Sequence, residues 1–352
     1  MKKILVKASK SYEVTVGCGI LNLAGAKLAA LLPPPHHLML VSDDNVAPLY
    51  AARVKSALED AGYTVDTFIF AAGEASKTTD TLVSLWEAMA AAGLTRTDCA
   101  VALGGGVVGD ITGFAAATYL RGIACYQIPT SLLAMVDSSV GGKTAVDLPQ
   151  GKNLCGAFAQ PIGVLCDTDV LKTLPEAVFT DGCAEVIKYG YIGDRPLLSL
   201  LENSFADNPV SIIARCVEDK RDVVERDELD NGPRQLLNLG HTGGHAIEKL
   251  SHFSISHGNA VAIGMLMAAK AAVAMGLCDP EVPAHQEALL KRYGLPTVCP
   301  FEAGAIAKAA LSDKKRRGST ITLVIPTALG ASTLLPLATD QLADFFRQGG
   351  AQ

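Results

Sequence analysis

The sequence predicts an α/β N-terminal domain with a Rossmann-like parallel sheet, followed by a mostly α-helical C-terminal domain. In the first half, short strand patterns alternate with helical patterns, which favours a parallel sheet with helices on both faces. A glycine-rich turn directly follows one of the apolar strands, as it does in nucleotide-binding folds. After residue 176, strand patterns nearly vanish and helical periodicity takes over.

The individual elements follow from hydrophobic periodicity in chain order. We expect strands at 3–7, 12–17, 38–42, 65–70 and 100–103, and helices at 46–61, 78–93 and 110–121. In the second half we expect helices at 176–192, 196–203, 209–227, 234–250, 258–276 and 281–293, with strands at 320–325 and 332–335. The change of pattern predicts a nucleotide-binding domain over residues 1–175 and a helical domain over residues 176–352.

Composition excludes several classes of protein. Hydrophobic residues make up 49% of the chain, which is enough for a packed core and argues against disorder. The formal net charge is −6, whereas nucleic-acid binding needs a basic surface. Nine cysteines without a C-x-x-C pair indicate reduced thiols. No signal peptide is evident, and Lys270 interrupts the apolar stretch 260–277. We expect a cytoplasmic protein without nucleic-acid or membrane partners.

The glycine-rich turn spans residues 104–109 and fits G-x-G-x-x-G between a strand and a helical stretch. Such glycines let the backbone approach a pyrophosphate at a helix N-terminus. The carboxylate expected about twenty residues later is missing, because the sequence there reads IPTSLL. We therefore expect a non-standard nucleotide site, with Asp43 or Asp44 as the alternative ribose partner. A tight turn without a ligand is the competing interpretation.

The loop over residues 129–153 carries lysines among glycines. Gly142, Lys143 and Thr144 suggest a P-loop, but Asp137 stands where the first glycine of that motif belongs. The loop still offers Asp137, Lys143, Lys152 and Asn153 to a ligand. Lysines on such loops bind phosphate or carboxylate groups as point charges. Solvated surface lysines are the competing interpretation.

A histidine cluster predicts a metal or catalytic site. His241 and His245 share one helical face, and His257 opens the next helix. Imidazoles and one carboxylate are the usual ligands of a catalytic zinc ion. Thr242 occupies the glutamate position of H-E-x-x-H, so the carboxylate must come from elsewhere, and Glu185 on an apolar helix is the candidate. Structural histidines are the alternative.

Basic and amide residues accompany this cluster. Lys188 lies on the same helical face as Glu185, and Lys220 precedes the histidines. Arg234 and Asn238 are four residues apart, so within one helix they would face the same pocket as the histidines. The charge run 313–317 is typical of a solvated loop.

Several motifs together resemble the 3-dehydroquinate synthases, in the order and at the spacing of that family. They are GGGVVGDITGFAAATYLRG, IPTSLLAMVDSSVGGKTAVDLPQGKN, AEVIKYG, LLNLGHTGGHAIE, ISHGNAVAIGM and SDKK. The resemblance extends along nearly the whole chain. It implies NAD and zinc as cofactors, with cobalt as a possible substitute metal, and a homodimer in which Arg121 reaches the partner's site.

The resemblance also implies roles for individual residues. The metal ligands would be Glu185, His241 and His257, which revises the pairing of His241 with His245. NAD would contact Asp44, Glu74, Lys77, Gly106, Val107, Val108, Gly109, Asp110, Thr130, Ser131, Lys143, Lys152, Leu171, Lys172 and Thr173. The substrate would contact Asp137, Lys143, Asn153, Lys188, Lys220, Arg234, Asn238, His245 and Lys314.

The reaction that the resemblance implies converts 3-deoxy-D-arabino-heptulosonate 7-phosphate to 3-dehydroquinate and phosphate, in the shikimate pathway of aromatic amino acid biosynthesis. It proceeds by transient oxidation, phosphate elimination, re-reduction, ring opening and an intramolecular aldol closure. The alternatives are another sugar phosphate cyclase, of the 2-deoxy-scyllo-inosose or valiolone type, a metal-dependent polyol dehydrogenase, or a non-catalytic NAD sensor. Four residues depart from the family pattern: Asn259 replaces a glutamate, Gly243 replaces a bulky apolar residue, Ser131 replaces a threonine, and Pro233 stands where leucine is common.

Overall fold

The computed structural model describes residues 1–230, 232–311, 316–317 and 319–352. Contacts within the chain divide it into two compact units. The first unit comprises Met1–Pro175 and Ile213–Leu229, and the second comprises Glu176–Ile212 and Asp230–Gln352. Helix α7 (Pro209–Arg226) therefore contributes most of its length to the first unit.

The first unit is built on a seven-stranded sheet with the order β1-β2-β9-β6-β5-β3-β4. Its strands are β1 (Lys2–Lys7), β2 (Ser11–Gly17), β3 (His37–Asp43), β4 (Thr64–Phe70), β5 (Cys99–Gly104), β6 (Ala124–Pro129) and β9 (Gly163–Asp167). Only the β1–β2 pair is antiparallel; all other neighbours in this sheet run parallel. The expected parallel α/β architecture is thus confirmed, although periodicity did not predict β6 and β9.

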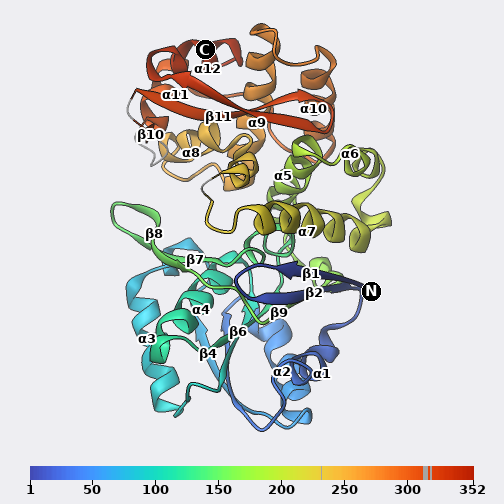
Figure 1. Ribbon diagram of the computed structural model, residues 1–352, viewed down its shortest axis with the longest axis vertical. Coiled ribbons are helices and arrows are strands. Elements are labelled where there is room, and N and C mark those ends of the chain that lie inside the picture. The colour runs from blue at the N-terminus through green and yellow to red at the C-terminus, as the bar shows by residue number, and fades with distance from the viewer. Residues whose placement is uncertain (231, 312–315, 318) are drawn as a thin grey trace. The chain divides into compact units, whose positions relative to one another are not determined.

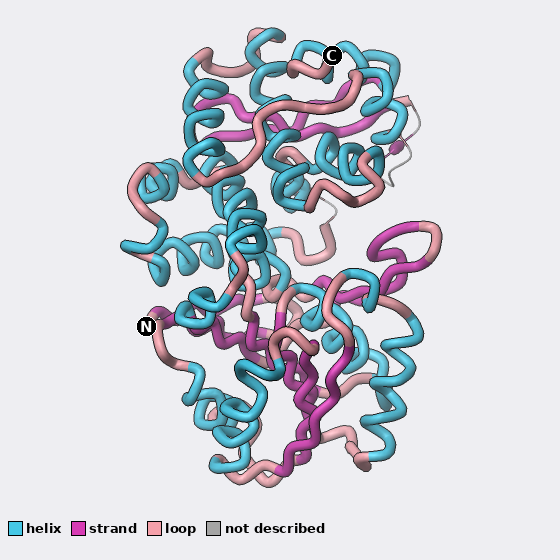
Figure 2. Tube along the Cα trace, turned by 180° about the vertical axis from the view of Figure 1, so that it is seen from behind, coloured by secondary structure: helices cyan, strands magenta, loops and turns pink. Residues whose placement is uncertain are grey.

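Helices cover both faces of this sheet, as Figures 1 and 2 show. They are α1 (Ala24–Ala29), α2 (Ala47–Asp60), α3 (Thr79–Ala91) and α4 (Gly106–Thr118), with the short 3-10 helices η1 (Leu21–Leu23), η2 (Glu74–Ser76), η3 (Tyr119–Arg121) and η5 (Thr168–Thr173). Met39 and Val41 of β3 pack against α3 and α4 in one apolar core. Leu38 and Leu40 are equally buried but point to the opposite face, because side chains alternate along a strand.

The order of the strands creates a topological switch point between β3 and β5. The chain leaves β3 towards β4 on one side, and leaves β5 towards β6 on the other. In open parallel sheets, ligands bind outside the carboxyl ends of the strands at such a point. This edge also carries the short π-helical turn η4 (Ala134–Ser138) and the hairpin of β7 (Lys143–Leu148) and β8 (Gly151–Phe158).

The second unit is mainly helical, as expected. Its helices are α5 (Glu176–Ile192), α6 (Arg195–Leu201), η6 (Phe205–Asp207), η7 (Pro233–Asn238), α8 (His241–Leu250), α9 (His257–Ala274), α10 (Glu281–Arg292), α11 (Ala303–Ala310), η8 (Thr339–Gln341) and α12 (Leu342–Gln348). A three-stranded antiparallel sheet completes it, with β10 (Arg316–Arg317), β11 (Thr320–Ala328) and β12 (Ala331–Ala338). By length and apolar composition α9 resembles a membrane span, and 72% of it is buried inside the structure.

The expectation of one continuous helix over residues 234–250 was wrong. The segment forms the 3-10 helix η7 and then α8, and the break falls at Leu239 and Gly240. Gly240 has a φ of +81°, a conformation that favours glycine. Its backbone also lies against α9, because a Cβ added to Gly264 would meet the Gly240 carbonyl oxygen at 2.1 Å. Glycines therefore let α8 and α9 approach closely.

Candidate functional site

Three helices of the second unit bring one carboxylate and two imidazoles together. Glu185 comes from α5, His241 is the first residue of α8, and His257 is the first residue of α9. Oε1 of Glu185 lies 3.5 Å from Nε2 of His241 and 3.2 Å from Nε2 of His257. One donor atom from each residue lies within 4.8 Å of the others, as a shared metal ion requires.

The other ring nitrogens of these histidines also have partners. Nδ1 of His241 lies 3.1 Å from the carbonyl oxygen of Leu239, and Nδ1 of His257 lies 3.3 Å from Oε2 of Glu248. Sequence reasoning assigned no role to Glu248. Its position two turns after His241 on the same face of an amphipathic helix is the signal that could have identified it.

The charges around this cluster suit a divalent cation. Burial lowers the pKa of His241 well below its ordinary value and keeps the imidazole neutral, as a metal ligand requires. Burial also lowers the pKa of His257, but hydrogen bonds to Glu185 and Glu248 outweigh this effect and raise the pKa to about 10. Lys188 forms an ion pair with Glu185. The two carboxylates thus favour added positive charge at His257, and the donor set fits a zinc-like ion.

The start of α9 is fastened to α5 one turn before Glu185. The carboxylate of Asp181 accepts hydrogen bonds from the Ser256 hydroxyl and, at 3.1 Å, from the Asn259 backbone N–H. A carboxylate satisfies free N–H groups at a helix N-terminus and complements the helix dipole. A Cβ on Gly258 would lie 1.9 Å from the Asp181 carbonyl oxygen, so only glycine permits this approach. These contacts help set the position of His257 relative to Glu185.

His245 lies one turn after His241, and the centroids of their rings are 5.4 Å apart. With Glu248 and His257 it forms a second group of metal-ligand type, again with donor atoms within 4.8 Å. Spacing paired His241 with His245 and named Glu185 as the carboxylate, whereas each of these two groups contains only one of the two histidines. Two arrangements of ligands therefore share His257.

Two other residues expected at this site, Arg234 and Asn238, lie on η7. Arg234 is 1% exposed on η7, and Asn238 at the end of η7 donates to the Gln235 carbonyl oxygen at 3.1 Å. Because η7 is a 3-10 helix, positions four residues apart do not share a face as they would in an α-helix, contrary to the expectation from spacing. Lys314 lies outside the described residues.

In the first unit, the glycine-rich turn joins the carboxyl end of β5 to α4. The N-cap Gly105 and the first helical residue, Gly106, carry no Cβ, and the backbone N–H groups of the first helical turn have no partner within the helix. Thr130 and Ser131 follow β6, and the Thr130 N–H donates to the Gly104 carbonyl oxygen at 2.9 Å. Asp44 follows β3 and accepts from the Ala72 N–H at 2.8 Å. Parallel strands thus gather these residues at one edge.

A buried ion pair lies beside this turn. Lys77 Nζ donates to Asp110 Oδ2 and to Asn153 Oδ1, each at 2.6 Å. Burial opposes the charge on Lys77, but Asp110 and other carboxylates raise its pKa. Burial raises the pKa of Asp110 to about 6, although Lys77 opposes this. The nearby pair of Lys152 and Glu74 is looser, at 3.7 Å.

Other predicted residues of the first unit lie on four further segments. Nζ of Lys220, in α7, donates to the backbone carbonyl oxygen and to the carboxylate Oδ1 of Asp137, in η4, each at 2.5 Å. A π-helical turn often marks a functional position. Lys143 begins β7. The segment of Leu171, Lys172 and Thr173 lies in η5 after β9, where Lys172 pairs with Asp169 at 2.6 Å.

Arg121 lies at the other end of α4 from the glycine-rich turn. It is exposed and has a φ of +68° in the short helix η3. Helix α4 has 13 residues, which corresponds to a length of roughly 20 Å at about 1.5 Å per residue. Arg121 is therefore remote from the nucleotide-binding edge of its own first unit.

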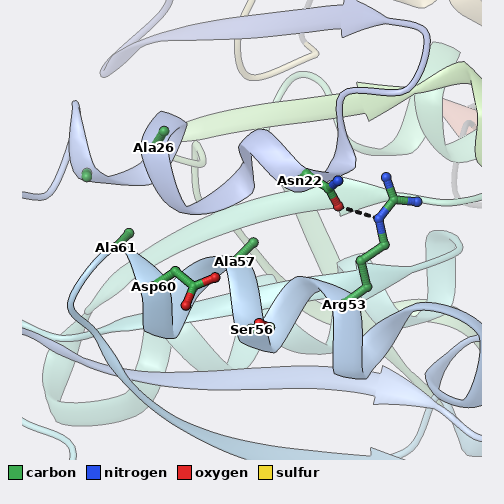
Figure 3. Close-up of a pocket in the computed structure, with 8 residues that line it drawn as sticks. Asn22, Ala26, Arg53, Ser56, Ala57, Asp60 and Ala61 are labelled. Atoms are coloured by element: carbon green, nitrogen blue, oxygen red, sulfur yellow. Dashed lines mark hydrogen bonds between the residues drawn. The ribbon is translucent and has the colours of Figure 1, made fainter.

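A separate hollow of about 700 Å³ lies between α1 and α2. Figure 3 shows that Arg53 reaches across it to Asn22, and that alanine side chains line much of its wall. None of the residues predicted for nucleotide, metal or substrate binding lines this hollow. We assign it no part in the candidate site.

Comparisons with known sequences agree on one family. Sequence models described as 3-dehydroquinate synthase N-terminal and 3-dehydroquinate synthase C-terminal match residues 67–181 and 182–316. A 3-dehydroquinate synthase of Xanthomonas campestris pv. campestris is 45% identical over 96% of this chain and 95% of that protein. One of Streptococcus gordonii is 43% identical over 96% of this chain and 97% of that protein.

Solved structures of sugar phosphate cyclases share the fold. A 2-deoxy-scyllo-inosose synthase complexed with carbaglucose-6-phosphate, NAD+ and Co2+ has a TM-score of 0.87 and 26% identity, covering 99% of this chain and 100% of its own. The 2-epi-5-epi-valiolone synthase of Streptomyces hygroscopicus subsp. jinggangensis, with NAD+ and Zn2+ bound, has a TM-score of 0.87 and 24% identity, covering 98% of each chain.

Proposed function

The chain belongs to the 3-dehydroquinate synthase family, and we propose that it performs the family's reaction with NAD and a divalent metal ion held by Glu185, His241 and His257. The activity is that of a carbon–oxygen lyase that converts 3-deoxy-D-arabino-heptulosonate 7-phosphate to 3-dehydroquinate and phosphate. The observation that carries the metal proposal is the approach of both Nε2 atoms to one buried oxygen of Glu185.

When bound, the metal ion would supply Lewis-acid chemistry toward a substrate hydroxyl, and NAD would supply redox chemistry. The protein's residues bind and orient. The first turn of α4 offers backbone N–H groups to the pyrophosphate of NAD, and Thr130 and Ser131 flank that turn. We also assign nucleotide contacts to Asp44, Glu74, Lys77, Asp110, Lys143, Lys152, Leu171, Lys172 and Thr173.

Cationic side chains suit a substrate that carries both a phosphate and a carboxylate. We assign substrate contacts to Lys143, Asn153, Asp137 and Lys220 in the first unit, and to Lys188, Arg234, Asn238 and His245 in the second. Charge-assisted hydrogen bonds from lysine and arginine are the strong ones. Arg234 is 1% exposed, and its planar guanidinium can bind a carboxylate or phosphate through two parallel hydrogen bonds. Lys314 belongs to the same assignment by resemblance alone.

In the proposed elimination, a ketone formed from the oxidised substrate hydroxyl acidifies the adjacent C–H. The proton passes to an oxygen of the phosphate, the C–H electron pair forms a carbon–carbon double bond, and the phosphate leaves with the electron pair of its carbon–oxygen bond. We place Arg121 in the neighbouring subunit's site, since it lies at the far end of α4 from the nucleotide-binding edge. This proposal requires a homodimer, and we place the enzyme in the cytoplasm.

The test is phosphate release from 3-deoxy-D-arabino-heptulosonate 7-phosphate, with zinc and sub-stoichiometric NAD. We expect many turnovers per NAD and loss of activity with a chelator or in His241→Ala. A folded, zinc-loaded protein that releases no phosphate would contradict the proposal. Net NADH formation would instead identify a polyol dehydrogenase.

A cyclase of the inosose or valiolone type is the second candidate, because two such structures share the fold with a TM-score of 0.87. The higher identity to 3-dehydroquinate synthases, 43–45%, favours the first candidate. Glucose 6-phosphate and sedoheptulose 7-phosphate in the same phosphate assay separate the candidates. Turnover of either sugar phosphate in preference to the heptulosonate would identify the second.

A further inference from the structure

Besides Glu185 on α5, the cluster has a buried carboxylate on α8, the helix that begins with His241. This carboxylate belongs to Glu248, and the proposed reaction does not use it. Glu248 is 5% exposed, and its Oε2 lies 3.3 Å from His257 Nδ1. A buried carboxylate is costly unless it accepts hydrogen bonds or pairs with a cation. Because this carboxylate faces one ring nitrogen of a proposed metal ligand, it influences whether the other ring nitrogen carries a proton or a lone pair.

That consequence follows from the chemistry of imidazole. A neutral ring has one N–H and one lone pair, and an ionised carboxylate can only accept. Glu248 therefore favours the ring of His257 with hydrogen on Nδ1, which leaves the lone pair on Nε2, 3.2 Å from Glu185 Oε1. His241 repeats the arrangement, with the Leu239 carbonyl oxygen at 3.1 Å from its Nδ1. Metal-binding histidines commonly have such an acceptor behind the ring.

We propose that Glu248 is a positioning residue that holds His257 in the Nδ1–H form and directs Nε2 to the metal ion. The proposal rests on the metal site assigned above and adds a residue to its support. The competing arrangement is the group of His245, Glu248 and His257, in which Glu248 itself would be a ligand. That arrangement requires His257 to bind through Nδ1, the nitrogen whose proton Glu248 accepts in the favoured arrangement.

The first experiment measures zinc affinity by competition with a chromophoric chelator, alongside the melting temperature of the metal-free protein. Loss of an acceptor behind a ligating histidine typically costs about 10- to 100-fold in metal affinity. We expect a loss of about tenfold in Glu248→Gln, whose amide oxygen still accepts, and of about 100-fold in Glu248→Ala. Glu202→Gln is the matched control, because Glu202 pairs with His285 Nε2 at 3.0 Å in the same unit. Its zinc affinity should stay unchanged.

The second experiment records the nitrogen and proton resonances of the histidine rings in zinc-loaded wild-type protein, and so remains informative if a variant fails to fold. We expect His257 to bind zinc through Nε2 and to keep its proton on Nδ1. Zinc on Nδ1 would overturn the proposal, and so would a lower melting temperature in Glu248→Gln with unchanged zinc affinity.

These outcomes are separate from failure of the proposed function. Wild-type protein that binds no zinc, or His241→Ala with unchanged zinc affinity, would contradict the metal site itself. Zinc binding that depends on His241 but not on Glu248 would contradict only the role of Glu248.

Discussion

The close approach of α8 and α9 sets the distance between the two proposed histidine ligands, and Gly264→Ala tests it. A Cβ at Gly264 would lie 2.1 Å from the Gly240 carbonyl oxygen and 2.9 Å from the Gly244 nitrogen. Both partners are backbone atoms, so no flexible side chain can move aside. Ordinary contact begins near 3.4 Å, so the helices must separate by about 1 Å.

Two opposing contributions change the free energy of unfolding on this substitution. Overpacking costs about 1–3 kcal/mol or more, while replacing a helical glycine by alanine returns up to about 1 kcal/mol. We therefore expect the free energy of unfolding to fall by roughly 1–2 kcal/mol. Ligands must be held to within about 0.5 Å, so zinc affinity should also fall, by about tenfold or more.

Gly243→Ala on α8 is the matched control. Its Cβ would lie 3.4 Å from Gly264 Cα and from Phe346, which is ordinary contact, and it borders a void of about 10 Å³. We expect a gain of about 0.5–1 kcal/mol in the free energy of unfolding and unchanged zinc affinity. Urea unfolding of the metal-free proteins and chelator competition measure both quantities. Wild-type stability and zinc affinity in Gly264→Ala would refute the reasoning.

Three further predictions concern single side chains. Asp181→Asn removes the charge that fastens the start of α9, so urea unfolding should show a loss of about 1 kcal/mol and chelator competition a weaker zinc complex; an unchanged pair of values would contradict this role. The pKa of Asp110 is raised from 3.8 to about 6, so between these pH values the folded protein holds a proton on Asp110 that the unfolded chain has lost. The free energy of unfolding should therefore fall by up to about 3 kcal/mol as the pH rises from about 4 to 6. In Asp110→Asn this fall should vanish in urea titrations at each pH; if it persists, Asp110 is not its source. Gln286 is 0% exposed, and its amide has no hydrogen-bond partner among the described residues, so Gln286→Met should raise the melting temperature, and a lower value would indicate an unseen partner.

Much of the fold could be predicted from the sequence because its signals are local. Alternation and apolar runs located β3 and β5, and the glycine-rich turn marked the start of α4. Where local signals compete, prediction failed: residues 234–250 have a helical pattern, yet Gly240 takes a positive φ and divides them. The gain from packing this segment against α9 outweighs the local preference.

The candidate site divides in the same way. The sequence by itself determined the residue types and the family resemblance, and so nominated Glu185, His241 and His257. Only the tertiary structure decided which ring nitrogen faces Glu185 and that Glu248 stands behind His257. The physical reason is that ring orientation depends on hydrogen bonds between different helices, whereas sequence periodicity reports only which residues share a face of one helix.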